Sequence, residues 1–268
     1  MEQRTQELET ANEELTTINE NFADLNQALI RSNQSLEQFA YVASYDLHEP
    51  LRKIQQFGDL LKTRYADSVD EGQDYIERMQ SAAARMSVLI KDLLDFSRSN
   101  TQCATSEPVV LHQVVDEVLT DLELLIKETG AQVEVDTLPI VAGDGRQLGQ
   151  LFQNLLSNAL KFRRPQVAPL IQIKYRTISA RQLPPLVKPS QTAQSYYQIE
   201  VIDNGIGFDE KYTDRIFQMF QRLHGKSEYA GTGIGLAICE KVVLNHGGAI
   251  TASSQPGQGA TFIIYLPA

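Results

Sequence analysis

Residues 39–54 read FAYVASYDLHEPLRKI and carry three side chains that could serve acid–base or group-transfer chemistry. Tyr45 and Asp46 are adjacent, and His48 follows about 60° around a helix from Tyr45. A phenol or an imidazole can accept a transferred group, and a neighbouring carboxylate can hold a proton. Pro50 comes next and is expected to bend the helix beside them. We therefore ask which side chain here accepts a group from a donor bound elsewhere.

A second set of candidate residues follows the sequence DGRQLGQLFQNLLSNALKF, which predicts a helix with Asp144 as its N-cap. At about 100° per residue, Asn154, Asn158 and Lys161 lie on one face of that helix. Amide oxygens beside an ammonium group suit a metal–phosphate ligand, because Mg²⁺ prefers hard oxygen ligands. Taken alone, this helix is better explained as one with a merely solvated polar face.

The stretch EVIDNGIGF runs from an apolar strand into Asp203, followed by Gly205 and Gly207. A carboxylate at a strand end can accept a hydrogen bond from an exocyclic amine such as adenine N6. The glycines would let a flat base approach the backbone. A tight turn alone also explains this pattern.

Glycines recur in two later stretches. In GTGIGLAI, Gly231, Gly233 and Gly235 open a predicted helix, whose N-terminal N–H groups could bind phosphate. In PGQGATF, Gly257 and Gly259 precede the final predicted strand.

Residues 209–231 are polar and basic in their middle, and they are flanked by glycines. We interpret them as a lid over a nucleotide. Phe217 and Phe220 are expected to anchor it, and Arg222 is expected to reach phosphate.

Three larger segments must position these residues. The first is a heptad pattern of about five repeats over residues 1–36, which predicts a parallel dimeric coiled coil. The alternative is one face of a surface helix packed on its own domain, but nothing precedes the pattern in this chain. The first set of seam positions is Leu8, Leu15, Phe22, Leu29 and Leu36.

The second segment, residues 37–101, carries two helical patterns, one running to about Tyr65 and one from Tyr75 to Phe96. A helical hairpin of this size cannot bury its apolar stripe alone. Two copies held by the coiled coil are expected to form a four-helix bundle.

The third segment, residues 107–268, alternates helical and strand patterns and predicts an α/β sandwich with a mixed sheet. Helical patterns cover about 110–129, 145–162 and 234–246. Strand patterns are AQVEV, IQIKYRTI, YYQIEVID, AITASS and TFIIYLP. Residues 177–195 are interpreted as an extended hairpin loop rather than a site.

Composition narrows the class of protein. Hydrophobic residues make up 42% and charged residues 22% of the chain, which is typical of a folded protein. No apolar run approaches the roughly 18 residues of a membrane span, and we recognise no signal peptide. The net charge of −10 disfavours nucleic acid and anionic membranes as partners. We expect a cytoplasmic protein without membrane insertion, with Cys103 and Cys239 reduced.

In their order and spacing, the helix asparagines, DxGxG, GTGIGL and GxGATF resemble the N, G1, F, G2 and G3 boxes of the histidine kinase ATPase domain. This fold is similar to that of the gyrase, heat-shock-90 and MutL ATPases. The resemblance implies that Asn158 coordinates Mg²⁺, Asp203 binds adenine, and Lys161 and Arg222 contact phosphates. The ATP-binding residues implied are Asn154, Asn158, Lys161, Asp203, Gly205, Gly207, Arg222, Gly231, Thr232, Gly233, Gly235, Leu236 and Thr261.

The hairpin resembles the dimerisation and phosphoacceptor domain of sensor histidine kinases, in the phytochrome-like type with a SHDLxEPLR box. In that box the acceptor precedes Asp-Leu, and in this chain Tyr45 stands there beside Asp46. A phenol has a pKa of about 10 and lacks the second nitrogen that Asp46 would hold in an imidazole. His48 is the alternative acceptor, about one turn further on, or else an ordinary, partly exposed helix residue.

Three functions are compatible with this pattern. The first is a dimeric histidine kinase module that autophosphorylates, with Tyr45, Asp46 and Asn158 as catalytic residues, and passes phosphate to the Asp of a response regulator receiver domain. In it Tyr45 either blocks phosphotransfer or is itself the acceptor. The second is a pseudokinase scaffold that docks partners through its bundle. A different ATPase of the same fold is disfavoured by the hairpin and coiled coil. The coiled coil implies an upstream sensor domain, which this chain lacks.

Overall fold

The computed structural model describes Phe22, Leu47 and residues 51–63, 73–98, 107–223, 229 and 231–268. The expected coiled coil of residues 1–36 lies outside the described residues, apart from Phe22, which is helical and exposed. The expected bend at Pro50 also lies outside them. So do the candidate acceptor residues Tyr45, Asp46 and His48.

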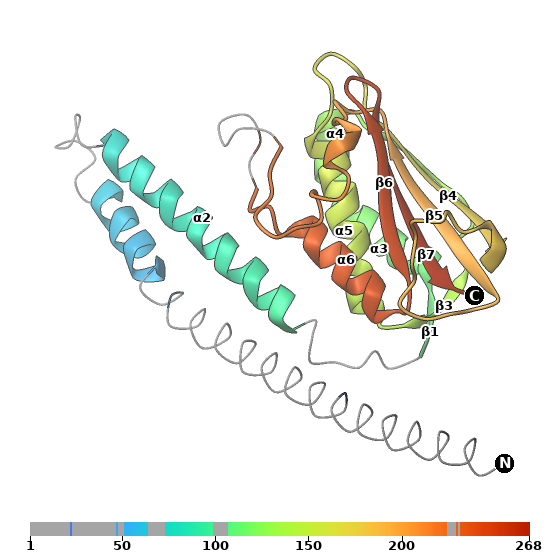
Figure 1. Cartoon of the computed structure of the whole chain (residues 1–268). Coiled ribbons are helices and arrows are strands. Elements are labelled where there is room, and N and C mark those ends of the chain that lie inside the picture. The colour runs from blue at the N-terminus through green and yellow to red at the C-terminus, as the bar shows by residue number, and fades with distance from the viewer. Residues whose placement is uncertain are drawn as a thin grey trace, which may run out of the picture.

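A helical hairpin begins the described structure, as the sequence predicts. Residues 51–63 are helical and lie beside α2 (Gln73–Arg98) (Figure 1). Leu51, Ala83 and Ile90 are buried together between the two helices. Two polar contacts also join the helices. The Gln80 side chain donates to Asp59, and Lys62 forms an ion pair with Glu77 at 3.2 Å.

A five-stranded mixed sheet covered by helices on one face forms the rest of the structure (Figure 1). The strand order is β2-β4-β5-β7-β6, in which β2 and β4 are parallel and the other pairs antiparallel. The strands are β2 (Gln132–Val135), β4 (Leu170–Ser179), β5 (Ser195–Asp203), β6 (Ala249–Gln255) and β7 (Gly259–Pro267). The helices are α3 (Leu111–Asp121), α4 (Glu123–Thr129), α5 (Gly145–Lys161) and α6 (Gly235–Asn245). The helical region followed by a mixed α/β layer confirms the predicted fold class.

The core lies between the sheet and α5. Leu148, Leu151 and Leu155 recur at helical spacing and are at most 1% exposed, against Ile173 and Ile199 of the central strands. Because this apolar stripe faces the sheet, the polar residues predicted on α5 lie on a different face of the helix.

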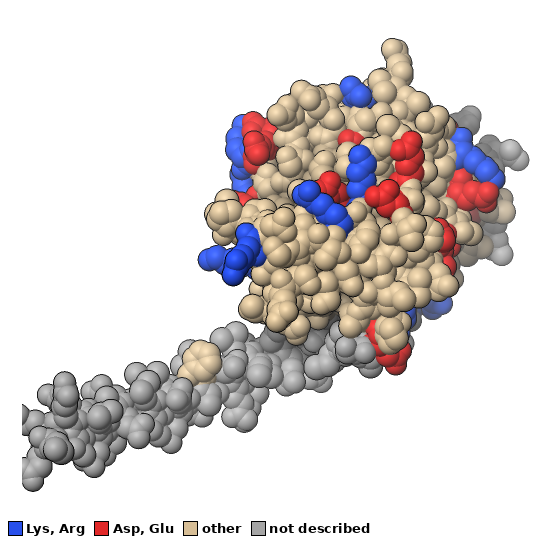
Figure 2. Space-filling model, turned by 90° about the vertical axis from the view of Figure 1, so that its right-hand side faces the viewer, with Lys and Arg blue, Asp and Glu red and all other residues tan. Residues whose placement is uncertain are grey.

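The face of the sheet opposite the helices is polar in part. The segment between β4 and β5 covers another part, where Leu183 and Val187 pack on the buried Ile178, Tyr196 and Tyr265. In the polar part, lysine and arginine side chains are interspersed with aspartate and glutamate (Figure 2). Arg176 donates to Gln198, which in turn donates to Glu200 on the same strand. Gln198 is itself only 5% exposed, so these contacts satisfy the polar atoms of a buried side chain.

Two features of the fold differ from the sequence prediction. The helical pattern of 110–129 forms two helices, because the chain turns at Leu122, which keeps that side chain buried at 7% exposure. The sequence also did not predict β1 (Glu107–Val110) and β3 (Ile140–Gly143), which pair as a separate two-stranded sheet. Each has four residues, too few for a clear period-two pattern.

The loop between β4 and β5 is confirmed as an extension of the hairpin. It contains the short helix η1 (Ala180–Gln182). It then folds back, where Ser190 and Gln191 donate backbone N–H groups to Gly248 and Gly247.

The segment before α6 contains the short helix η2 (Glu210–Tyr212). Phe217 is buried, which confirms it as an anchor. The prediction for Phe220 was wrong, because its side chain is 59% exposed and its φ is +63°. Its backbone N–H instead donates to the Gly233 carbonyl, so the left-handed turn at Phe220 serves a backbone contact. No helix within the described ranges is long and apolar enough to span a bilayer.

Candidate functional site

A cavity of about 240 Å³ opens where α5, the end of β5 and the loop before α6 meet α2. It gathers most of the predicted site residues from segments that are far apart in the sequence. The predicted residues that line it are Asn154, Asn158, Lys161, Asp203, Gly207, Arg222, Gly231, Thr232, Gly233, Gly235 and Leu236.

Two predicted residues are not part of the lining. Gly205 lies behind the Asp203 carboxylate and donates its N–H to Oδ1. Thr261 lies on β7, where its neighbours Ala260 and Phe262 line the cavity. Because successive side chains of a strand point to opposite faces, Thr261 points away from the cavity.

Asp203 lines the cavity, and its two carboxylate oxygens differ in their hydrogen bonding. Its Oδ1 accepts from Gly205 N at 2.8 Å and from Ala260 N at 3.3 Å. No hydrogen bond from a described residue reaches Oδ2. Burial raises the pKa of Asp203, and the two backbone hydrogen bonds oppose that rise. The arrangement leaves one buried acceptor for a ligand donor.

The face of α5 presents amide and ammonium groups to the same cavity. Asn154, Asn158 and Lys161 line it together, as their helical spacing predicts. The Nδ2 atom of Asn154 is buried and has no hydrogen-bond partner among the described residues. Because this atom is enclosed by protein and the Asn154 side chain contacts the buried Cys239 thiol, the amide oxygen beside Gly235 is the atom of Asn154 that can face a ligand.

Two cationic side chains, Lys161 and Arg222, also line the cavity, and the Lys161 ammonium lies 4.4 Å from the centroid of the Phe162 ring. Burial, followed by the nearby Arg222 guanidinium, lowers the pKa of Lys161. Arg222 donates to the carbonyls of Gly231 and Tyr229, at 2.9 Å and 2.6 Å. Because two cations in one cavity repel each other, an anionic ligand between them would be favoured.

The loop that leads into α6 has a backbone form that favours glycine. Gly233 has a φ of +78°, and a Cβ there would lie 2.9 Å from the Gln221 carbonyl oxygen. Gly207, on the other wall, has a φ of +62° and would place a Cβ 2.2 Å from the Gln255 carbonyl oxygen. The loop aims the N-terminus of α6 at the cavity, where free N–H groups favour an anion.

Sequence reasoning missed half of the lining residues, among them Phe162, Tyr229 and Asp92. The rings of Phe162 and Tyr229 meet at a centroid distance of 4.9 Å and form an aromatic wall. Asp92 reaches the cavity from α2, where its Oδ2 accepts from the Thr232 hydroxyl at 2.5 Å. Phe162 directly follows Lys161 and could have been noticed, but nothing local to Asp92 signals this contact.

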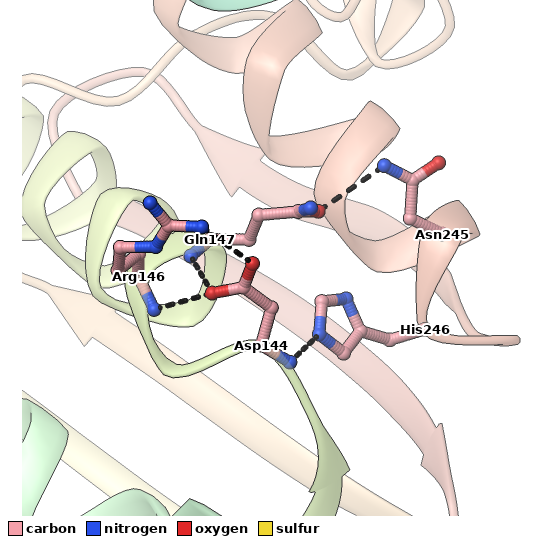
Figure 3. Close-up of polar contacts among 5 residues, drawn as sticks. All are labelled: Asp144, Arg146, Gln147, Asn245 and His246. Atoms are coloured by element: carbon pink, nitrogen blue, oxygen red, sulfur yellow. Dashed lines mark hydrogen bonds and ion pairs between the residues drawn. The ribbon is translucent and has the colours of Figure 1, made fainter. Parts of the chain in front are cut away.

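The helices α5 and α6 are joined to each other at the ends that lie away from the cavity, namely the start of α5 and the end of α6 (Figure 3). Asp144 caps α5 by accepting from the Arg146 and Gln147 N–H groups, which confirms the predicted N-cap. The Asp144 backbone N–H donates to His246 Nε2 at 3.0 Å, and Asn245 donates to Gln147. These bonds tie the start of α5 to the end of α6, so the helices run antiparallel with a fixed register.

The donor set of the cavity fits a magnesium nucleotide. A carboxylate acceptor suits an exocyclic amine, aromatic rings flank the space, and amide oxygens on α5 suit a hard cation. Two cations and a helix N-terminus suit phosphate groups.

Comparison with known protein families gives two matches. Residues 143–268 match the family described as histidine kinase-, DNA gyrase B-, and HSP90-like ATPase. Residues 35–102 match the His Kinase A (phospho-acceptor) domain, which includes position 45.

Curated relatives include two cyanobacterial phytochromes. The chain is 39% identical over 87% of its length to the phytochrome-like protein Cph1 of Synechocystis sp., covering 29% of that protein. It is 40% identical over 87% of its length to cyanobacterial phytochrome A of Nostoc sp., covering 28%. The chain therefore spans less than a third of the length of these relatives.

Solved structures share the fold. Full-length ShkA in complex with AMPPNP superposes with a TM-score of 0.61 at 22% identity, over 86% of this chain and 45% of that chain. The histidine kinase AdeS of Acinetobacter baumannii gives a TM-score of 0.53 at 19% identity, over 81% of this chain and 96% of that one.

Proposed function

The chain belongs to the sensor histidine kinases, as a transmitter module with an acceptor hairpin and an ATPase domain, and on this basis we propose that it binds Mg-ATP in the cavity between α5 and α6. The observation that carries the proposal is that one cavity is lined by the open Asp203 oxygen and by the two cations Lys161 and Arg222.

Each part of the nucleotide has a place in this proposal. Adenine donates its amine to Asp203 Oδ2, and the aromatic wall of Phe162 and Tyr229 lies beside the base. Asn158 holds Mg²⁺ through its amide oxygen, and Lys161 and Arg222 contact phosphates. When bound, Mg²⁺ would neutralise part of the phosphate charge.

We propose the same organisation for the rest of the chain as the sequence suggests. Residues 1–36 form a coiled-coil linker, 37–101 the acceptor hairpin and 107–268 the ATP-binding domain. The described hairpin exposes Phe57, Leu60 and Met86, which a second copy would cover in a homodimer. The partners are an upstream sensor domain and a response regulator receiver domain, in the cytoplasm, without nucleic acid or membrane insertion.

Position 45 determines the chemistry that nucleotide binding can support. In the family the residue here receives the phosphoryl group and passes it to a response regulator. We propose that Tyr45 impairs or alters that transfer, because a neutral phenol is a weak nucleophile and Asp46 cannot orient it as it would an imidazole. The same residue favours the second candidate, an ATP-dependent scaffold that docks partners through its bundle.

Asp203→Asn tests nucleotide binding. Oδ1 already accepts from two backbone N–H groups, so the asparagine oxygen is held there and its NH₂ group faces the ligand. Two donors then meet, and we expect ATP affinity to fall about 10- to 100-fold by calorimetry. Asp121→Asn, an exposed site on α3, should leave affinity unchanged. Undiminished binding in Asp203→Asn would remove the basis of this assignment.

A further inference from the structure

A carboxylate from the acceptor hairpin reaches into the nucleotide cavity. Asp92 of α2 accepts from the Thr232 hydroxyl at 2.5 Å, across 140 residues of sequence. Thr232 lies between Gly231 and Gly233, in the loop that opens α6, and both Asp92 and Thr232 line the cavity. The contact therefore joins the two parts of the chain at the predicted phosphate end of the site.

The contact lies within a packed interface. Leu89 and Phe96 are three residues before and four residues after Asp92, which places all three on one face of α2. Both apolar side chains pack against the core of the ATPase domain. Asp92 is half-buried between them, so its carboxylate is held at the cavity by the docking of α2.

The carboxylate occupies a position suited to an anionic ligand. Lys161 and Arg222 line the same cavity, and the α6 N-terminus points into it. A hydroxyl has one proton to donate, so Thr232 can serve Asp92 or a phosphate oxygen, but not both at once. A terminal phosphate next to Asp92 would also place like charges side by side.

We propose that Asp92 competes with the terminal phosphates of the nucleotide, so that docking of α2 on the cavity and full occupancy by ATP exclude one another. ATP then loosens α2 from the ATPase domain, and an empty site holds it. This inference rests on the proposed nucleotide site and adds regulation of that site by the acceptor hairpin.

Asp92→Asn isolates the charge, because an asparagine oxygen can still accept from Thr232. In the full chain with Mg²⁺, we expect ATP to bind about tenfold more tightly than to the unaltered protein. ADP should gain less and adenosine nothing, because the effect follows phosphate charge. Glu77→Gln, on α2 but paired with Lys62, should change none of the three affinities.

A second readout follows α2 itself. Hydrogen exchange of the α2 amides should rise when ATP is added to the unaltered chain and rise less with adenosine. In Asp92→Asn, a smaller ATP concentration should give the same rise.

The outcomes separate the two claims. Equal ATP affinity in the unaltered chain and Asp92→Asn would overturn the competition while leaving the nucleotide site intact. Weaker ATP binding in Asp92→Asn, restored by excess Mg²⁺, would overturn it in favour of Asp92 as a metal ligand. If neither protein binds ATP, ADP or adenosine, the nucleotide site fails and this inference fails with it.

Discussion

Asp203 combines a structural role with an oxygen that we propose binds a ligand. Backbone N–H groups of Gly205 and Ala260 fix its Oδ1, which sets the plane of the carboxylate and the direction of Oδ2. The end of β5 supplies the buried position, and burial raises the pKa of the group. In the proposed complex, a ligand amine would meet an acceptor that is already oriented before binding, which would lower the entropic cost of recognition.

The histidine at the end of α6 is held in one neutral tautomer. His246 Nε2 accepts from the Asp144 N–H, and Nδ1 lies 2.7 Å from the Val242 carbonyl oxygen, so the proton is on Nδ1. Burial lowers the pKa of His246, opposed by the Val242 hydrogen bond and the Asp144 carboxylate. In a doubly protonated ring Nε2 would also carry a proton, so two donors would face each other and the hydrogen bond from the Asp144 N–H would be lost.

This state predicts a pH dependence of stability. Above a pH of about 6.5, His246 is neutral in both the folded and unfolded chain, and its contribution is complete. As the pH falls from there toward the lowered folded pKa, only the unfolded chain gains a proton. The free energy of unfolding then decreases, by at most about 1.4 kcal/mol per pH unit.

Denaturant unfolding at pH 7.5 and 5.5 measures this loss. His246→Gln should be less stable at pH 7.5 but should lose less on acidification than the unaltered chain. His112→Gln, a half-exposed histidine on α3, should keep the full acid-dependent loss. An unchanged loss in His246→Gln would show that another group is responsible.

At the scale of elements, the site depends on α5 and α6 lying antiparallel. Their far ends are joined through Asp144, Gln147, Asn245 and His246 (Figure 3). The C-terminal end of α5 places Lys161 at the cavity, and the N-terminal end of α6 places Gly235 there. A shift of either helix along its axis would separate the glycine loop before α6, which we propose binds phosphate, from the α5 polar face.

The loop before α6 gives a prediction at this scale. Gly233→Ala introduces a Cβ at a φ of +78° and only 2.9 Å from a backbone oxygen, so the loop must move. We expect ATP affinity to fall at least about tenfold, with adenosine affinity changed less.

Gly149→Ala is the matched control. Gly149 lies inside α5, and its Cβ would lie 3.8 Å from Val114, an ordinary contact. Stability should rise by about 0.5–1 kcal/mol with ATP affinity unchanged. Equal effects of both substitutions in a calorimetric titration would contradict the special role of the Gly233 backbone.

The sequence predicted the elements with a strong period and the motifs that lie within single elements. The α5 polar face and the glycine loop are local patterns, so spacing was enough to find Asn158 and Gly233. The β1–β3 pairing and the turn at Leu122 depend on packing between segments, which local periodicity does not contain. Asp92 was missed for the same reason, because its partner Thr232 is 140 residues away.

At the scale of the molecule, α2 connects the acceptor hairpin with the nucleotide cavity. Its Leu89 and Phe96 pack on the ATPase core, while its Ala83 and Ile90 pack with Leu51 of the first hairpin helix. Movement of α2 would therefore change both the cavity and the acceptor region. This is the arrangement expected of a module that couples an upstream signal to phosphoryl transfer.

The most direct test is acid and alkali treatment of protein incubated with γ-labelled Mg-ATP, comparing the chain with Tyr45→His. We predict no acid-labile label on the chain itself, and acid-labile, alkali-stable label on Tyr45→His. That label should vanish when Asp203→Asn is added to Tyr45→His. Acid-labile label on the unaltered chain, or none on Tyr45→His despite bound ATP, would contradict a kinase module whose acceptor position is Tyr45.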